Sequence, residues 1–148
     1  GVQTCALPIC LSGLDSAALR VVRLLSAELT LAAGDPTQAV VLLEPKAAVM
    51  ATNDRATRML LGQSRVATQK PLQAKTAAGE LVVWLNQHPR DASAWLLLAS
   101  AYEAQGDALR AIRAQAEARA VELDPKNRDA WMALGRTEAA LGKSDAAP

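Results

Sequence analysis

The residues of this chain best suited to do chemistry are its two cysteines and its single histidine, Cys5, Cys10 and His88. A pair of cysteines could form a disulfide, and thiolates together with an imidazole are common zinc ligands. The spacing Cys-x4-Cys with one distant His is not a zinc pattern. Any role for the cysteines therefore depends on the stretch that carries them.

That stretch, "GVQTCALPIC", has no Lys or Arg before Arg20, so it lacks the basic start of a secretory signal. Back-translated, residues 1–9 resemble the end of a common sequencing adapter. We expect residues 1–10 to be a non-native tail, with the native domain over residues 11–148. On this hypothesis Cys5 and Cys10 have no part in folding, and a disordered tail would lead to the same functional conclusion.

Catalytic signatures are missing from the sequence. It contains no H-E-x-x-H, no G-x-S-x-G and no G-x4-G-K-[ST]. His88 precedes Pro89, and we expect it to be a solvated or locally hydrogen-bonded loop residue. The prediction is a chain that is not an enzyme and that holds no metal or cofactor.

Composition restricts the partners. The 148 residues include 16 basic and 15 acidic side chains, which is no electrostatic footprint for nucleic acid. No apolar run reaches the ~18 residues of a membrane span. There is no Phe, and the many alanines favour closely packed helices.

The chain also repeats itself. "HPRDASAWLLLASAYEAQGD" aligns with "DPKNRDAWMALGRTEAALGK" 36 residues later, and Gly106 lies 72 residues after Gly34. The spacing of Trp95, Leu98 and Tyr102 places them on one helix face. Gly106 is expected to end that helix, and a second helix should bring Ala111 into close contact with it. The middle copy has Lys70 where the others have Gly.

Other side chains have plain structural explanations. Arg113 and Glu117 are spaced for an ion pair on a solvated face, although the arginines of this helix could also contact an acidic partner. Helical spacing favours an inter-helix core over ligand binding for the tryptophans, which are Trp84, Trp95 and Trp131. Helix capping explains the aspartates near expected helix starts, which are Asp15, Asp35, Asp54, Asp91 and Asp107.

The pattern W-x2-L-[GA]-x2-Y, then Gly, then Ala, then Asp-Pro, resembles the tetratricopeptide repeat. The resemblance implies an all-α fold, an antiparallel helix-pair solenoid with a right-handed superhelical twist. Its expected units cover about residues 20–54, 55–91 and 92–127, with a partial unit over 128–148. In this family the first helices line a concave protein-binding groove. The transferred groove residues are Leu24, Glu28, Met59, Gln63, Ser93, Leu96, Ser100 and Glu103.

The segment "LNQHPRDASAWLLLASAYEAQGDALRAIRAQAEARAVELD" is also similar to the C-terminal repeats of bacterial periplasmic zinc metallopeptidases of the beta-barrel assembly-enhancing type. This resemblance implies a periplasmic location, contact with outer-membrane assembly machinery and a catalytic domain that this chain lacks. The alternative is a free-standing repeat scaffold or assembly factor of the envelope. Either way, we expect a protein or peptide partner.

Overall fold

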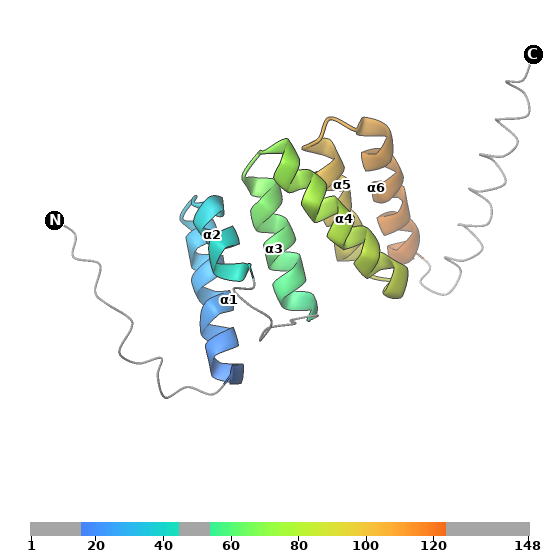
Figure 1. Cartoon of the computed structure of the whole chain (residues 1–148). Helices are drawn as coiled ribbons and strands as arrows, with labels where there is room; N and C mark the ends of the chain where they lie inside the picture. The colour runs from blue at the N-terminus through green and yellow to red at the C-terminus, as the bar shows by residue number, and fades with distance from the viewer. Residues whose placement is uncertain (1–15, 45–53, 124–148) are drawn as a thin grey trace, which may run out of the picture. The chain divides into compact units, whose positions relative to one another are not determined.

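The computed structural model describes residues 16–44 and 54–123 (Figure 1). All the regular elements in these residues are α-helices, six in number, which confirms the all-α class. The helices belong to two compact units, one ending at Thr68 and the other beginning at Gln69. This boundary lies inside the expected unit 55–91. Cys5, Cys10, Asp15 and Trp131 lie outside the described residues, as does the expected partial unit 128–148.

The first compact unit contains α1 (Ser16–Ala32), α2 (Pro36–Leu43) and α3 (Arg55–Ala67), shown from blue to green in Figure 1. Two fully buried alanines, Ala27 on α1 and Ala39 on α2, belong to its apolar core. Their small side chains let the helix backbones approach each other closely. The core is completed by Val40, Leu43 and Leu61, with Leu24, Leu31, Leu42 and Leu60 packed against it.

An ion pair also links parts of this unit. Nη2 of Arg65, on α3, lies 3.4 Å from Oε1 of Glu44, the residue that ends α2. Arg65 is 6% exposed, whereas the Glu44 side chain is about half exposed. The pair therefore ties a buried cation to a carboxylate at the surface.

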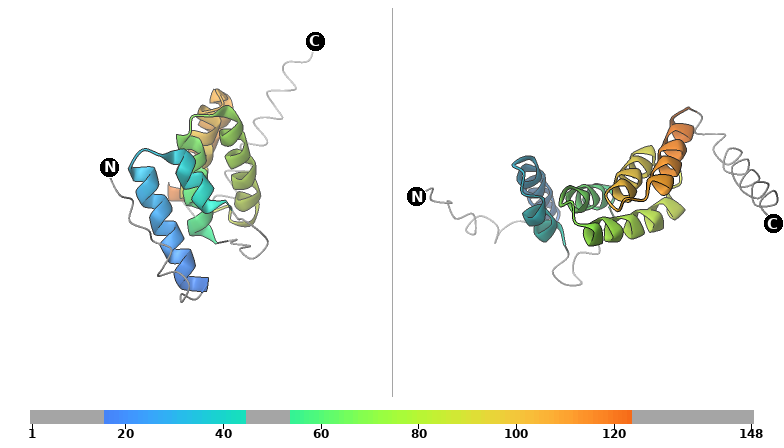
Figure 2. Two further views of the ribbon diagram at one scale, coloured as in Figure 1. Left: turned by 60° about the vertical axis from the view of Figure 1, so that its left-hand side comes forward. Right: turned by 90° about the horizontal axis from the view of Figure 1, so that it is seen from above.

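The second compact unit contains α4 (Pro71–Gln87), α5 (Ala92–Glu103) and α6 (Ala108–Leu123). The middle helix, α5, packs against both α4 and α6, as the two views in Figure 2 also show. Most of the buried residues on these helices are alanines, in agreement with the close packing expected from composition. They are Ala74, Ala77, Ala78, Ala94, Ala99, Ala101, Ala111, Ala114 and Ala118.

Two turns repeat the same geometry 72 residues apart. Gly34 and Gly106 both adopt the left-handed conformation, with φ of 87° and 78°. In each turn the next N–H reaches back to a carbonyl of the preceding helix, from Asp35 to Thr30 at 3.1 Å and from Asp107 to Tyr102 at 3.0 Å. The predicted helix-ending role of Gly106 is thereby confirmed, together with its equivalence to Gly34.

The middle turn differs from the expected register. The left-handed residue there is Gln69, with φ of 55°, and not Lys70. Lys70 is extended, at φ −92°, and stands at the N-cap of α4 before Pro71. The alignment was wrong by one residue because neither residue is a glycine that would mark the turn.

The aspartate caps are confirmed where the structure describes them. Asp35 Oδ1 accepts from the Gln38 N–H at 2.9 Å, and Asp54 Oδ1 accepts from the Thr57 N–H at 2.8 Å. In the second unit the cap bonds join Ala94 N–H to Asp91 at 3.2 Å and Arg110 N–H to Asp107 at 3.1 Å. These carboxylates satisfy backbone donors at helix starts.

Candidate peptide-binding surfaces

The transferred groove residues of the second compact unit share one open face of α5. Ser93, Leu96, Ser100 and Glu103 are all exposed, and Leu96 is 45% exposed near the middle of the helix. Their spacing places them on one side of the helix. Because α4 and α6 pack on the other sides of α5, this face is left with an apolar centre and polar flanks.

The four transferred residues of the first compact unit do not share such a face. Glu28 and Gln63 are exposed. Met59 is only 9% exposed, and Leu24 packs against the apolar core. The expected groove therefore needs correction here, since Met59 is buried and Leu24 belongs to the partly buried residues around the apolar core.

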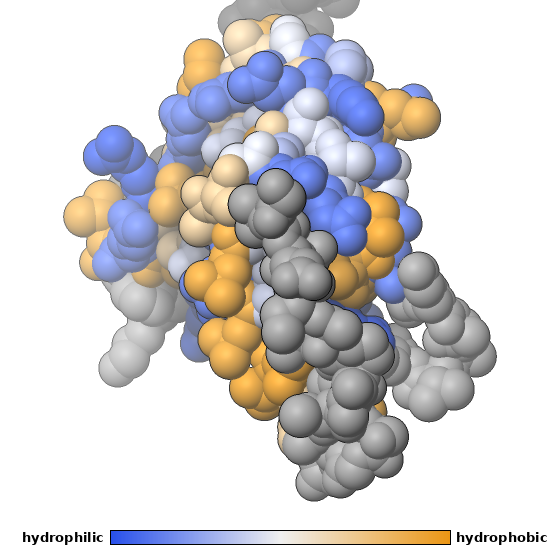
Figure 3. Space-filling view, turned by 90° about the vertical axis from the view of Figure 1, so that its left-hand side faces the viewer, coloured by the Kyte–Doolittle hydropathy of each residue, from blue (hydrophilic) through white to orange (hydrophobic). Residues whose placement is uncertain are grey.

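A further apolar surface runs along α1. Val21, Val22, Leu25 and Leu29 are 52%, 39%, 53% and 71% exposed. Hydrophobic atoms gather on the side of the molecule that carries α1, which faces the viewer in Figure 3. The sequence "VVRLLSAEL" indicates this surface, because its apolar residues extend around more of the helix circumference than a single buried face requires.

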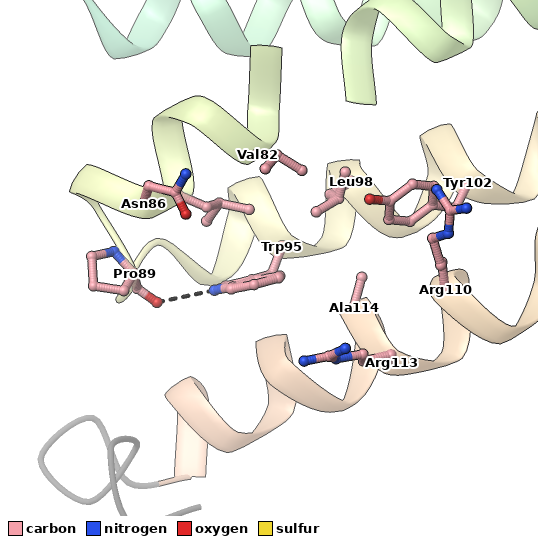
Figure 4. A pocket seen from close by; sticks show the side chains of 10 residues that line it. Val82, Asn86, Pro89, Trp95, Leu98, Tyr102, Arg110, Arg113 and Ala114 are labelled. Carbon is pink, nitrogen blue, oxygen red and sulfur yellow. Dashed lines mark hydrogen bonds between the residues drawn. The ribbon is translucent and has the colours of Figure 1, made fainter. Parts of the chain in front are cut away.

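A pocket of about 460 Å³ opens on the second compact unit, between α4 and α6 and over α5 (Figure 4). Trp95, Leu98 and Tyr102 line it from α5, on a side of that helix away from Leu96. Their spacing predicts that all three share one helix face, and Trp95 is expected in an inter-helix core. Only Leu98 is fully buried, while Trp95 and Tyr102 are half-buried walls. The remaining lining residues are Val82, Leu85, Asn86, Pro89, Arg110, Arg113 and Ala114.

Both charged residues of the pocket lining are arginines of α6. The Arg110 Nε lies 2.9 Å from Oδ2 of Asp107, and its guanidinium carbon is 5.5 Å from the centre of the Tyr102 ring. Within the described residues, no carboxylate pairs with Arg113. The predicted Arg113–Glu117 ion pair is thus not formed, and the Arg113 guanidinium is available at the pocket.

The other aromatic residues of this unit have structural roles at the turn between α4 and α5. The Trp84 and His88 rings are stacked, with centroids 3.7 Å apart, and Nδ1 of His88 lies 3.2 Å from the Trp84 carbonyl oxygen. The indole N–H of Trp95 donates to the Pro89 carbonyl at 3.0 Å. His88 is therefore the locally hydrogen-bonded residue that was predicted, and Trp84, 6% exposed, is core.

The described residues contain no group of three His, Cys, Asp or Glu side chains that could hold a metal ion. None of the helices over residues 16–44 and 54–123 is long and apolar enough to cross a bilayer. The candidate binding surfaces of these residues are the exposed face of α5, the apolar surface along α1 and the pocket. Comparison with protein-family models, curated proteins and solved structures finds no match to the chain.

Proposed function

We propose that this chain is a protein–protein interaction module with no chemistry of its own, in which the exposed face of α5 binds a peptide segment of a partner. The observation that carries the proposal is the placement of Ser93, Leu96, Ser100 and Glu103. All four are exposed on a helix that is otherwise enclosed by two neighbours. An apolar centre with a polar border is the usual composition of a protein-binding surface.

The matching turns at Gly34 and Gly106 support a tetratricopeptide-like solenoid as the architecture of this module. In such arrays each unit buries its apolar face against the next, and one side is left for binding. From the resemblance to periplasmic metallopeptidase repeats we also propose that the module works in the periplasm, beside outer-membrane assembly machinery, in a protein that carries a catalytic domain as well. A free-standing envelope scaffold is the alternative, and an H-E-x-x-H motif in the coding sequence upstream would favour the peptidase.

Selection from a random peptide library on the full chain tests the binding proposal. We expect the selection to enrich peptides that bind the chain. Their affinity for the Leu96→Asp variant should be lower by about tenfold or more, because central apolar side chains dominate such interfaces. Leu72→Asp is the matched control, since Leu72 is a 75% exposed leucine on α4 of the same unit. Thermal melts establish that both variants fold. Equal losses in the two variants, or no enriched peptide, would contradict the proposal.

A further inference from the structure

The pocket on the second compact unit combines two kinds of chemistry. Its floor and walls are largely apolar, with Leu98 at the base and the Trp95 and Tyr102 rings beside it. Figure 4 shows the two arginines on the α6 side, with Val82 and Asn86 on the α4 side. A volume of about 460 Å³ is within the ~300–1,000 Å³ range of sites that enclose ligand groups.

The charges at the pocket are unbalanced. No carboxylate belongs to its lining. Asp107 already neutralises Arg110, whereas Arg113 has no acidic partner in the described part of the chain. Glu117 lies one turn further along α6, is not paired with Arg113 and does not line the pocket. The guanidinium of Arg113 can therefore form a two-pronged contact with an incoming carboxylate, the geometry that arginine favours.

We propose that this pocket is a second binding site, which takes an acidic peptide segment of a partner protein. One large apolar side chain of the peptide enters between Trp95 and Tyr102, and a neighbouring carboxylate pairs with Arg113. Aromatic walls suit an aromatic anchor, because offset ring contacts add to the gain from burial. The site is distinct from the proposed α5 face, since Leu98, at the base of the pocket, lies on nearly the opposite side of α5 from Leu96.

The probe for this site is a fluorescein-labelled peptide with a single Phe flanked by Asp and Glu, titrated into the full chain by fluorescence anisotropy. Two matched peptides replace the Phe by Ala, or each acidic residue by its amide. We expect saturable binding of the first peptide, and affinity lower by about tenfold or more for each of the others. Binding of the Phe-to-Ala peptide with equal affinity would reduce the interaction to general charge attraction and overturn the proposal.

Two pairs of variants locate the binding. Arg113→Glu is compared with Arg119→Glu, an equal charge change at an exposed arginine of the same helix that does not line the pocket. Val82→Asp is compared with Val83→Asp, because Val82 lines the pocket and the more exposed Val83 does not. The first member of each pair should weaken binding about tenfold or more, and the second by less than about twofold. Equal effects within a pair would overturn the proposal.

Two alternative occupants of the pocket predict results that differ from those of a partner peptide. If the pocket holds a second copy of this chain, sedimentation will show dimers that Val82→Asp dissociates and Val83→Asp does not. If residues 124–148 fill it, the full chain will not bind the peptide and a chain ending at residue 123 will. Either result overturns the proposal for a partner peptide. Leu96→Asp tests the α5 face separately, so the proposal for one site can be contradicted while the proposal for the other is supported.

Discussion

Across the turn between α4 and α5, the indole N–H of Trp84 donates a hydrogen bond to Oδ2 of Asp91 at 3.1 Å. The other carboxylate oxygen of Asp91 accepts from the Ala94 N–H and caps α5. One aspartate therefore satisfies the polar atom of a buried tryptophan and begins the next helix. This arrangement fixes where α5 starts relative to α4, and hence where the side walls of the pocket lie.

Asp91→Ala should lower the free energy of unfolding by about 2–4 kcal/mol, since it removes an N-cap and leaves a buried indole N–H without its acceptor. Asp91→Asn should cost less, because its single amide oxygen can replace one of the two bonds. Urea denaturation measures both. Asp107→Ala, which removes a cap at a more exposed position, should cost only about 1 kcal/mol. If Asp91→Ala costs no more than this control, the Trp84 bond contributes nothing.

Glycine substitutions in the second compact unit should act with opposite signs. Gly79 lies inside α4 with open space where a Cβ would stand, so Gly79→Ala should stabilise the unit by about 0.5–1 kcal/mol. Gly106 also has open space, but its φ is +78°, and Gly106→Ala should destabilise by about 1–2 kcal/mol. Denaturation midpoints of the two variants test this. Shifts in the same direction would refute the left-handed turn at Gly106.

The helix class, the caps and the two glycine turns could be predicted because each depends on local backbone chemistry. The turn at Gln69 could not be placed, since a left-handed glutamine leaves no mark in a sequence. The burial of Met59 depends on tertiary packing around α3, and family positions alone do not contain that information. The Arg113–Glu117 spacing allowed a pair, but such pairs are worth only about 0.2–0.5 kcal/mol and form only where nothing competes.

The pocket was missed for a different reason. Its α5 residues were recognised as one helix face, but whether that face is filled or hollow depends on the separation of α4 and α6. Its lining brings together residues far apart in the sequence, such as Val82 and Arg113, and sequence spacing does not show how they come together. The one feature of the sequence that indicates a hollow here is the small Ala114 among the larger Trp95 and Leu98, because a small side chain leaves space between large ones.

Gln69→Gly should raise the free energy of unfolding. Glycine relieves the roughly 1–2 kcal/mol that a side chain costs in a left-handed residue, and this is partly offset by the ~0.4–1 kcal/mol of extra entropy in the unfolded chain. The expected net gain is about 0.5–1 kcal/mol by these principles. Lys70→Gly is the control and should destabilise, because Lys70 already has an ordinary extended backbone. If urea denaturation shows that Lys70→Gly stabilises the chain and Gln69→Gly destabilises it, Lys70 is the residue equivalent to Gly34 and Gly106 after all.

Deletion of residues 1–10 should leave the thermal midpoint unchanged within a few degrees. The expectation rests on the adapter-like sequence and the absence of a zinc spacing for Cys5 and Cys10. Melts of the full and shortened chains under oxidising and reducing conditions measure it. A clear drop on deletion, or on reduction of the full chain, would show that the cysteines belong to the fold.

Ala111 is 2% exposed on α6, the helix that packs closely against α5. Ala111→Leu should overpack this contact and lower the free energy of unfolding by about 1–3 kcal/mol. Ala116→Leu adds the same atoms on the same helix at an exposed position, and should change stability by less than about 0.5 kcal/mol.

Glu103→Ala should have a similarly small effect on stability, because the hydrogen bond that Glu103 accepts from Gln115 at 2.7 Å is exposed, but it should alter peptide binding at the α5 face. Urea denaturation of the three variants, with peptide titration of the last, tests the assignment. If Ala111→Leu is neutral and Glu103→Ala unfolds the chain, the inner and outer faces of this helix pair have been exchanged.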